Sequence, residues 1–278
     1  MPVRGQTLNW TNDDLDELSA LYDPTSARRW WESSAQAKLG RIFESEDETS
    51  LVEEQPERSR GFVLLAASIV LPILFDVATG EFVDSTGRAL RRKMIVRELH
   101  NAILDARASV LSLFDDVRTG RITLSQWQGE MQRWISDVHT TAAALGRGGF
   151  TRMSVRDLER LAVSLRFHLE RLSAFTEQMQ SREILLAGKA QMRAGQYIHA
   201  ARGVYFQFEK IRFQERGFKQ ERNILAPIER HCAECPGEST KGWVKIGDLT
   251  PIGARICIMN CQCGIEYRIG PGGKIIRW

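Results

Sequence analysis

Cysteine is the residue type in this chain whose spacing could do chemistry. All five cysteines fall between positions 232 and 263: a C-x2-C pair, Cys232 and Cys235, and a C-x3-C-x-C group, Cys257, Cys261 and Cys263. Such clustering indicates either a metal site or disulfide bonds. A C-x2-C turn holds two thiolates on one side of a tight loop, as a tetrahedral zinc site requires. Alternate residues of an extended chain share a face, so Cys261 and Cys263 can converge in the same way.

Two observations favour a metal over disulfides. The number of cysteines is odd, and the stretch after Met1 is polar and acidic, without the apolar region of a secretion signal. Disulfides are rare in a reducing cytoplasm, where zinc is the better explanation. A reduced or disulfide-linked cluster stays open as the alternative. The predicted zinc ligands are Cys232, Cys235, Cys261 and Cys263, with Cys257 and His231 as alternates.

The predicted role of the zinc is structural. Residues 231–278 are too few to form a good core alone, and the free energy of metal binding can replace that core. A nucleophilic cysteine would need a base within hydrogen-bond reach, yet neighbours such as His231 and Cys232 point apart on an extended chain. The chain also has no P-loop, G-x-S-x-G or H-E-x-x-H motif. We therefore predict that it is not an enzyme and has no small-molecule substrate.

The C-terminal region resembles a known family. The similarity is to the C-terminal motif of tailed-phage head morphogenesis proteins, the minor head proteins similar to protein F of phage Mu. It is carried by Cys232-Ala233-Glu234-Cys235, Gly242-Trp243-Val244, Leu249-Thr250-Pro251-Ile252-Gly253 and Asn260-Cys261-Gln262-Cys263. Ile258-Met259 stands where the family usually has His-Pro, and Gln262 replaces the usual arginine. The cysteine frame is intact.

The resemblance implies a structural protein of a phage or prophage virion, assembled in the host cytoplasm. It implies portal and capsid proteins as partners, and no membrane. Packaged DNA is a further partner left open, because residues 181–230 carry ten basic and five acidic side chains. The rival interpretation is a zinc-ribbon-like nucleic-acid-binding protein that uses this basic segment. A phage-borne enzyme or toxin is the third interpretation.

The elements that would position the cysteines are predicted to be mainly α-helical. Apolar residues recur every three or four positions in helices over residues 89–114, from Thr123, and over 154–179, 181–195 and 196–223. Short strands are expected at 243–246, 264–269 and 274–278, and a hairpin at 75–83. The predicted fold is a multi-helix domain with a small C-terminal cysteine-stapled β module.

Three regions follow from this pattern. Residues 1–60 are predicted to form acidic N-terminal helices and a linker, 61–225 the helical domain, and 226–278 the cysteine-rich β module. The uncharged stretch Phe62–Phe75 has fourteen residues and contains Pro72. A membrane-spanning helix needs about 20 apolar residues, so we expect this stretch to be buried in the protein.

Exposed aromatic residues are the predicted contacts with assembly partners. A protein that joins larger partners should present apolar or aromatic side chains at its surface. The candidates are Trp30 and Trp31 beside the acidic N-terminal region, and Tyr205, Phe206 and Phe208 in the basic segment.

Overall fold

The computed structural model describes residues 60–62, 73–76, 81–84, 86–182, 186, 188–228, 231–255 and 261–278. The predictions for the N-terminal helices, for Trp30 and Trp31, for Cys257 and for most of the apolar stretch lie outside these ranges. From that stretch Phe62 and residues 73–75 are described, and Ile73 is buried as expected.

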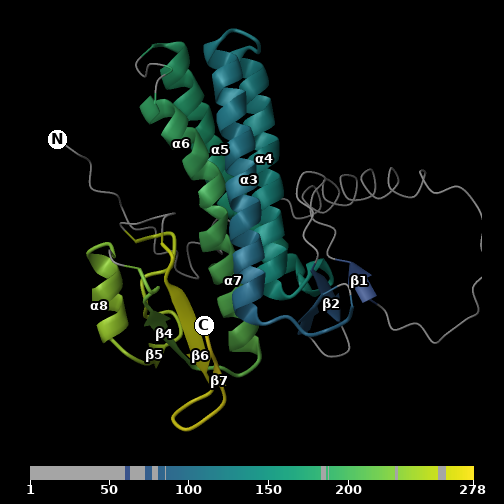
Figure 1. Ribbon diagram of the computed structural model, residues 1–278, viewed down its shortest axis with the longest axis vertical. Coiled ribbons are helices and arrows are strands. Elements are labelled where there is room, and N and C mark those ends of the chain that lie inside the picture. The colour runs from purple at the N-terminus through teal and green to yellow at the C-terminus, as the bar shows by residue number, and fades with distance from the viewer. Residues whose placement is uncertain are drawn as a thin grey trace, which may run out of the picture.

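Among the described residues, five helices form a bundle (Figure 1). They are α3 (Arg92–Arg118), α4 (Leu124–Arg147), α5 (Val155–Gln180), α6 (Gly188–His199) and α7 (Ala201–Glu215). In this bundle α6 and α7 follow one another beside the other three. A single 3-10 turn, η1 (Phe150–Arg152), joins α4 to α5. The prediction of a mainly α-helical fold is confirmed. Within the described part of the chain, no helix has both the length and the apolar character needed to cross a membrane.

Local sequence explains where two of these helices begin. At the start of α4, the Gln126 backbone N–H donates to Thr123 Oγ1, and the Thr123 N–H donates back to Gln126 Oε1. Ser154 and Asp157 make the same reciprocal pair at the start of α5. Each capping box satisfies two backbone donors that the first helical turn leaves unpaired. Both starts were expected from the sequence.

Helix α4 is the centre of the bundle. It packs against α3, α5 and α7, and every residue from Val138 to Arg147 is buried. Gly146 lets α7 come close, because a Cβ on this glycine would lie 2.5 Å from the Tyr205 carbonyl oxygen. The buried charge of Arg147 is met by Asp157 at 2.8 Å and by Glu215 at 2.8 Å.

The predicted helix over 196–223 is wrong in its last part. Helix α7 ends at Glu215, and Gly217 has a φ of +81°, which favours glycine and breaks the helix. Residues Gln220–Ile224 then form strand β4. The C-terminal sheet thus takes a strand from the segment that we assigned to the helical domain.

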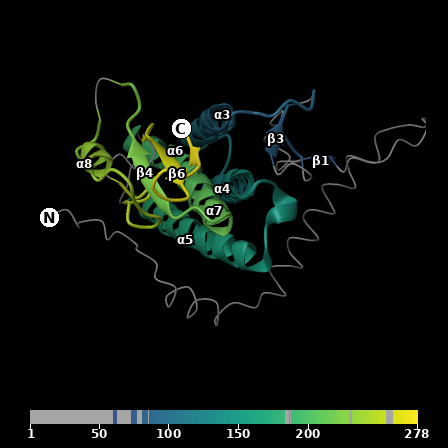
Figure 2. The same ribbon diagram turned by 90° about the horizontal axis from the view of Figure 1, so that it is seen from below.

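The C-terminal module contains a four-stranded antiparallel sheet in the order β5-β4-β6-β7. Its elements are β4, α8 (Glu234–Thr240), β5 (Val244–Lys245), β6 (Gly264–Arg268) and β7 (Ile275–Ile276). A second sheet joins β1 (Arg60–Phe62), β2 (Leu74–Asp76) and β3 (Glu81–Val83). Its β2–β3 pairing confirms the predicted hairpin. Viewed along the bundle, the C-terminal module and this second sheet lie on different sides of the helices (Figure 2).

The C-terminal module packs closely on helices α3 and α7. Arg92 donates from Nε to Glu209 Oε1 at 2.6 Å and from Nη1 to the Ile265 carbonyl of β6. Gly203 of α7 faces Gly253, and a Cβ on Gly253 would lie 3.1 Å from the Gly203 Cα. The described cysteines and the helical side chains therefore belong to one continuous core.

Candidate metal centre

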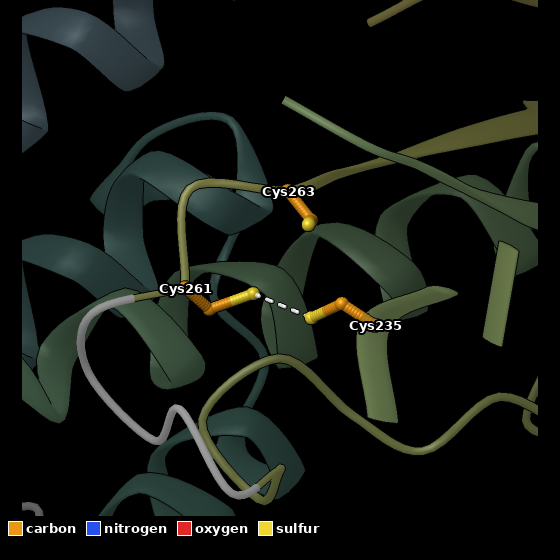
Figure 3. A group of neighbouring side chains, drawn as sticks. All are labelled: Cys235, Cys261 and Cys263. Carbon is orange, nitrogen blue, oxygen red and sulfur yellow. Dashed lines mark hydrogen bonds between the residues drawn. The ribbon is translucent and has the colours of Figure 1, made fainter. Parts of the chain in front are cut away.

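Three cysteines meet inside the C-terminal module. Cys235 is in the first turn of α8, and Cys261 and Cys263 lie just before β6. All three side chains are buried, and their sulfur atoms lie within 4.8 Å of one another. Figure 3 shows the three side chains converging from these two segments. The structure thus brings together three of the four zinc ligands that were predicted from the sequence.

The sulfur distances suit a tetrahedral metal site. With a Zn–S bond of about 2.3 Å, two thiolates on one zinc ion lie about 3.8 Å apart. The Cys235 and Cys261 sulfur atoms are 3.8 Å apart. The Cys232 and Cys235 sulfur atoms are 3.2 Å apart, well beyond the S–S bond length of about 2.0 Å. None of the four described cysteines is in a disulfide bond.

Two neighbouring side chains offer a fourth ligand. Cys232 is half-buried and lies beside Cys235, although its sulfur is outside the mutual group of three. His231 has its Nδ1 4.0 Å from the Cys263 sulfur. The predicted ligand Cys232 and the predicted alternate His231 therefore each lie next to one member of the group, Cys235 and Cys263 respectively.

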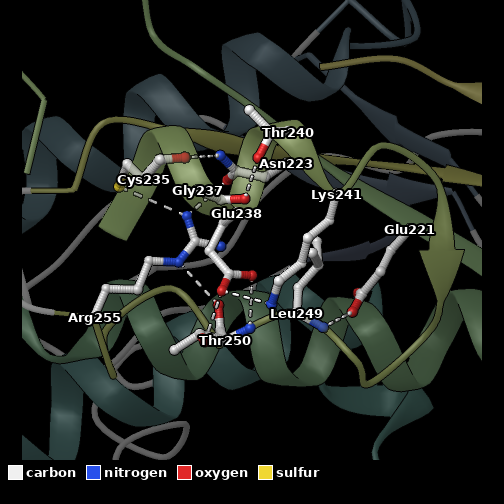
Figure 4. Close-up of polar contacts among 10 residues, drawn as sticks. All are labelled: Glu221, Asn223, Cys235, Gly237, Glu238, Thr240, Lys241, Leu249, Thr250 and Arg255. Carbon is white, nitrogen blue, oxygen red and sulfur yellow. Dashed lines mark hydrogen bonds and ion pairs between the residues drawn. The ribbon is translucent and has the colours of Figure 1, made fainter. Parts of the chain in front are cut away.

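A buried arginine, which the sequence analysis missed, supports the cluster. Arg255 lies with Nη1 3.7 Å from the Cys235 sulfur, and the same nitrogen donates to Asn223 Oδ1 at 2.7 Å. Its Nε donates to the Thr250 carbonyl at 2.9 Å, and Asn223 Nδ2 donates to the Cys235 carbonyl. Figure 4 shows these contacts between α8 and the loop that precedes Arg255. A fixed positive charge beside a cysteine favours its thiolate form.

Two carboxylates hold the loop between β5 and Arg255 in place. Glu238 accepts hydrogen bonds from the backbone N–H and the hydroxyl of Thr250, both at 3.0 Å, and from Lys241 at 2.8 Å. Burial works against ionisation of Glu238, but these hydrogen bonds prevail and lower its pKa. Glu221 of β4 accepts from the Gly247 N–H at 2.9 Å. Burial raises the pKa of Glu221 in spite of this bond.

The electrostatics of the thiols predict how metal binding would depend on pH. Burial raises the pKa of Cys263, and the hydrogen bond from the Ala226 backbone partly opposes this. A thiol that is protonated at neutral pH must lose its proton to bind a metal. Metal affinity at this site should therefore fall as the pH is lowered.

The arrangement can bind a metal ion. Thiolate ligands suit zinc and other soft metals, and structural zinc sites are closed by four protein ligands. Here the three sulfur atoms are buried and two further ligands lie at hand. The fold and the site together define a helical protein with a cysteine-rich β module. Comparisons of the chain with protein-family models, curated proteins and solved structures gave no match.

The aromatic residues of α7 that were predicted as partner contacts are not at the surface. Tyr205 and Phe208 are fully buried, and Phe206 is 4% exposed. The prediction of their exposure is wrong because α7 is covered by α4 on one side and by the C-terminal module on another. Tyr205 also donates from its hydroxyl to Glu209 at 2.7 Å, inside the core.

Several charges of the basic segment 181–230 are also used internally. Arg202 is buried and donates to the Cys263 carbonyl at 3.2 Å. Arg212 lies 3.7 Å from Glu209, and Arg222 pairs with Glu266 at 2.7 Å. The excess positive charge of this segment is therefore only partly available to an outside partner.

Proposed function

We propose that this chain is a structural assembly protein whose C-terminal module is held together by one zinc ion. Cys235, Cys261 and Cys263 supply three ligands, and Cys232 or His231 supplies the fourth. The observation that carries the proposal is the meeting of three buried sulfur atoms within 4.8 Å, from segments 26 residues apart in sequence.

The module is small, so a bound metal ion would add stability that it otherwise lacks. Its strands are two to five residues long, so strand pairing alone provides little stability. Structural zinc contributes about 10–16 kcal/mol in small zinc-binding peptides, and that binding energy becomes folding energy. The metal would fix α8 and the loop that carries Arg255 against β6, and so complete the surface of the module.

We further propose that the protein acts as a minor head protein of a phage or prophage, in the virion, through contacts with portal and capsid proteins. The support is the resemblance of its cysteine frame and of the Gly242–Val244 and Leu249–Gly253 segments to that family. Leu249 and Ile252 from these segments pack in the same core as the three cysteines. These five residues, which all belong to the resemblance, therefore share one core.

Metal analysis tests the zinc proposal. The purified, reduced protein should contain about one zinc per chain, and Cys235→Ser and Cys263→Ser should lose it. The fourth ligand is identified by comparing the metal content of His231→Ala and Cys232→Ser at equal protein concentration. The substitution that weakens metal binding marks the ligand. Lys274→Ser, a change at an exposed residue in the same module, is the control. A folded protein with no metal and five freely titratable thiols would overturn the proposal.

A genetic exchange tests the assembly role. In the phage that encodes this chain, Cys235→Ser should reduce the yield of infectious particles and leave heads that are immature or empty of DNA. Lys274→Ser should give a normal yield. Heads are counted by electron microscopy and particles by plaque assay. Normal particle yield from a Cys235→Ser variant that has demonstrably lost its metal would contradict the role.

A further inference from the structure

A cavity of about 930 Å³ lies where the start of α3 meets the C-terminal module. Its walls come from residues between 88 and 100, from residues 224–227 after β4, and from Arg202, Gln262 and Trp278. Neither the zinc proposal nor the resemblance assigns a use to this cavity. Its size is that of a ligand-binding site rather than a packing defect.

The charged side chains that line the cavity have one sign. Its basic residues are Arg88, Arg91, Lys93, Arg97 and Arg202, and none of the described lining residues is an aspartate or glutamate. The His100 imidazole also lines the cavity, and its pKa is lowered by burial and then by the charge of Arg202. The cavity therefore attracts an anion.

Two of these charges are available to a ligand. Arg91 and Lys93 are exposed and make no ion pair or side-chain hydrogen bond with the described residues. Arg88 and Arg97 have only surface partners, Asp84 at 3.4 Å and Glu98 at 3.3 Å. Exposed ion pairs contribute little, so an incoming anion can compete for these arginines.

The cavity also has an apolar part. Leu90, Met94 and Pro227 line it together with the indole of Trp278. The indole is held in place, because it lies against Gly264, where a Cβ would be 1.9 Å from the ring, and because Arg92 sits 5.1 Å from the ring centre. A fixed aromatic ring inside a basic cavity is the combination that single-stranded nucleic acid requires: phosphates on the cations and a base against the ring.

The spacing of the cations fits the same ligand. From Arg91 to Arg97 the helix advances about 9 Å along its axis. A stacked strand advances about 3.4 Å per nucleotide, so the stretch of α3 that carries the lining cations has the length of about two to three phosphates. In a duplex the bases are stacked inside and cannot reach Trp278. We propose that this cavity binds a single nucleic-acid strand, with its phosphates along Arg88, Arg91, Lys93 and Arg97 and a base near Trp278.

The proposal changes which residues would contact nucleic acid. The composition pointed to the basic segment 181–230, yet of its described basic residues only Arg202 lines the cavity. The other four cations come from the start of α3 and the residue stretch just before it. The site is independent of the assembly role, and its failure would leave the zinc proposal untouched.

Binding of the full-length protein to a labelled oligo-dT strand of about twenty nucleotides tests the proposal, with fluorescence anisotropy as the readout. The test variant is Arg91→Glu/Lys93→Glu. The control is Arg118→Glu/Lys189→Glu, which makes the same charge change at exposed residues at the other end of α3 and at the start of α6. We expect at least a tenfold loss of affinity in the test variant and less than a twofold change in the control.

The salt dependence gives a second, independent readout. Each lost phosphate contact on a single strand lowers the slope of log K against log salt by about 0.7, so the test variant should lose about 1.4. Trp278→Ala should weaken binding by about fivefold or more without changing the slope. Its metal content and helical circular dichroism show whether the module is still folded.

Two outcomes would overturn the proposal. One is an equal loss of affinity in the test and control variants, which would mean attraction by overall charge alone. The other is tight, Arg91-dependent binding of a glutamate-rich peptide with no binding of the strand, which would assign the cavity to an acidic protein segment.

Discussion

Acid should destabilise this protein through two histidines that lie together in the bundle, His139 and His168. His139 of α4 is fully buried, and its Nε2 lies 2.9 Å from the Tyr197 carbonyl oxygen. The ring of His168 on α5 is 4.6 Å away, centre to centre. Burial lowers the pKa of His139 to about 4. Burial, then the charges of His139 and Arg171, lower the pKa of His168 to about 3.

The direction of the effect follows from which state binds protons. An unfolded histidine has a pKa of about 6.5, so below that pH the unfolded chain takes up protons that the folded chain does not. The stability that comes from a neutral buried histidine is complete above about pH 6.5 and is lost as the pH falls toward 4. With a folded pKa of about 4, His139 alone should cost about 2 kcal/mol of unfolding free energy at about pH 5.

Urea unfolding at about pH 7.5 and about pH 5 measures this loss. The informative variant is His139→Gln, because a glutamine amide can hydrogen-bond to the Tyr197 carbonyl from the position of Nε2 and does not titrate. The wild type should lose more stability between the two pH values than the variant does, by about 2 kcal/mol. The same loss in both proteins would show that His139 is not held neutral by the fold, and would refute this reasoning.

Two further changes test the packing of the bundle and the support of the metal site. Gly146→Ala should destabilise the protein to urea by about 1–3 kcal/mol, because its Cβ would lie 2.5 Å from the Tyr205 oxygen. The control is Gly129→Ala in the same helix, where the added Cβ would have no neighbouring atom within 4 Å. It should be neutral or stabilise the protein by up to about 1 kcal/mol. Equal effects of the two changes would contradict the close approach of α4 and α7. Arg255→Met should lower zinc affinity by about 10–100-fold in a chelator competition; unchanged affinity would mean that its charge does not reach Cys235.

The helices could be predicted from sequence, because their apolar stripes and capping residues are local signals. Thr123 and Ser154 mark the starts of their helices through hydrogen bonds to residues only three positions further along the chain. Strand β4 could not be predicted in this way. Its buried positions are Glu221 and Asn223, so the period-two pattern of a strand is present but is carried by polar side chains. These polar side chains can be buried because they form hydrogen bonds with distant residues: Glu221 with backbone N–H groups and Asn223 with Arg255.

The candidate site was predicted to a similar extent. Cysteine spacing identified Cys235, Cys261 and Cys263, because a metal site needs particular atoms at short separations. Arg255 carries no such signal, since its role depends on a loop that folds back against α8. The error over Tyr205 and Phe208 has a related cause: α7 is covered on more than one side, and its sequence alone does not distinguish a buried aromatic face from an exposed one.

The metal centre and the basic cavity share a segment, so metal binding and strand binding should be coupled. Gln262 lies between two of the proposed zinc ligands and lines the cavity, and Arg202 lines the cavity while donating to the Cys263 carbonyl. Removing the metal would release this segment and disturb the cavity wall, so chelation should weaken binding of the strand. Arg91 and Lys93 project from the start of α3, outside the module, so Arg91→Glu/Lys93→Glu should retain its zinc. If a fully metal-free protein bound the strand as tightly as the zinc form, the two sites would be independent, and the segment 261–263 would not shape the cavity.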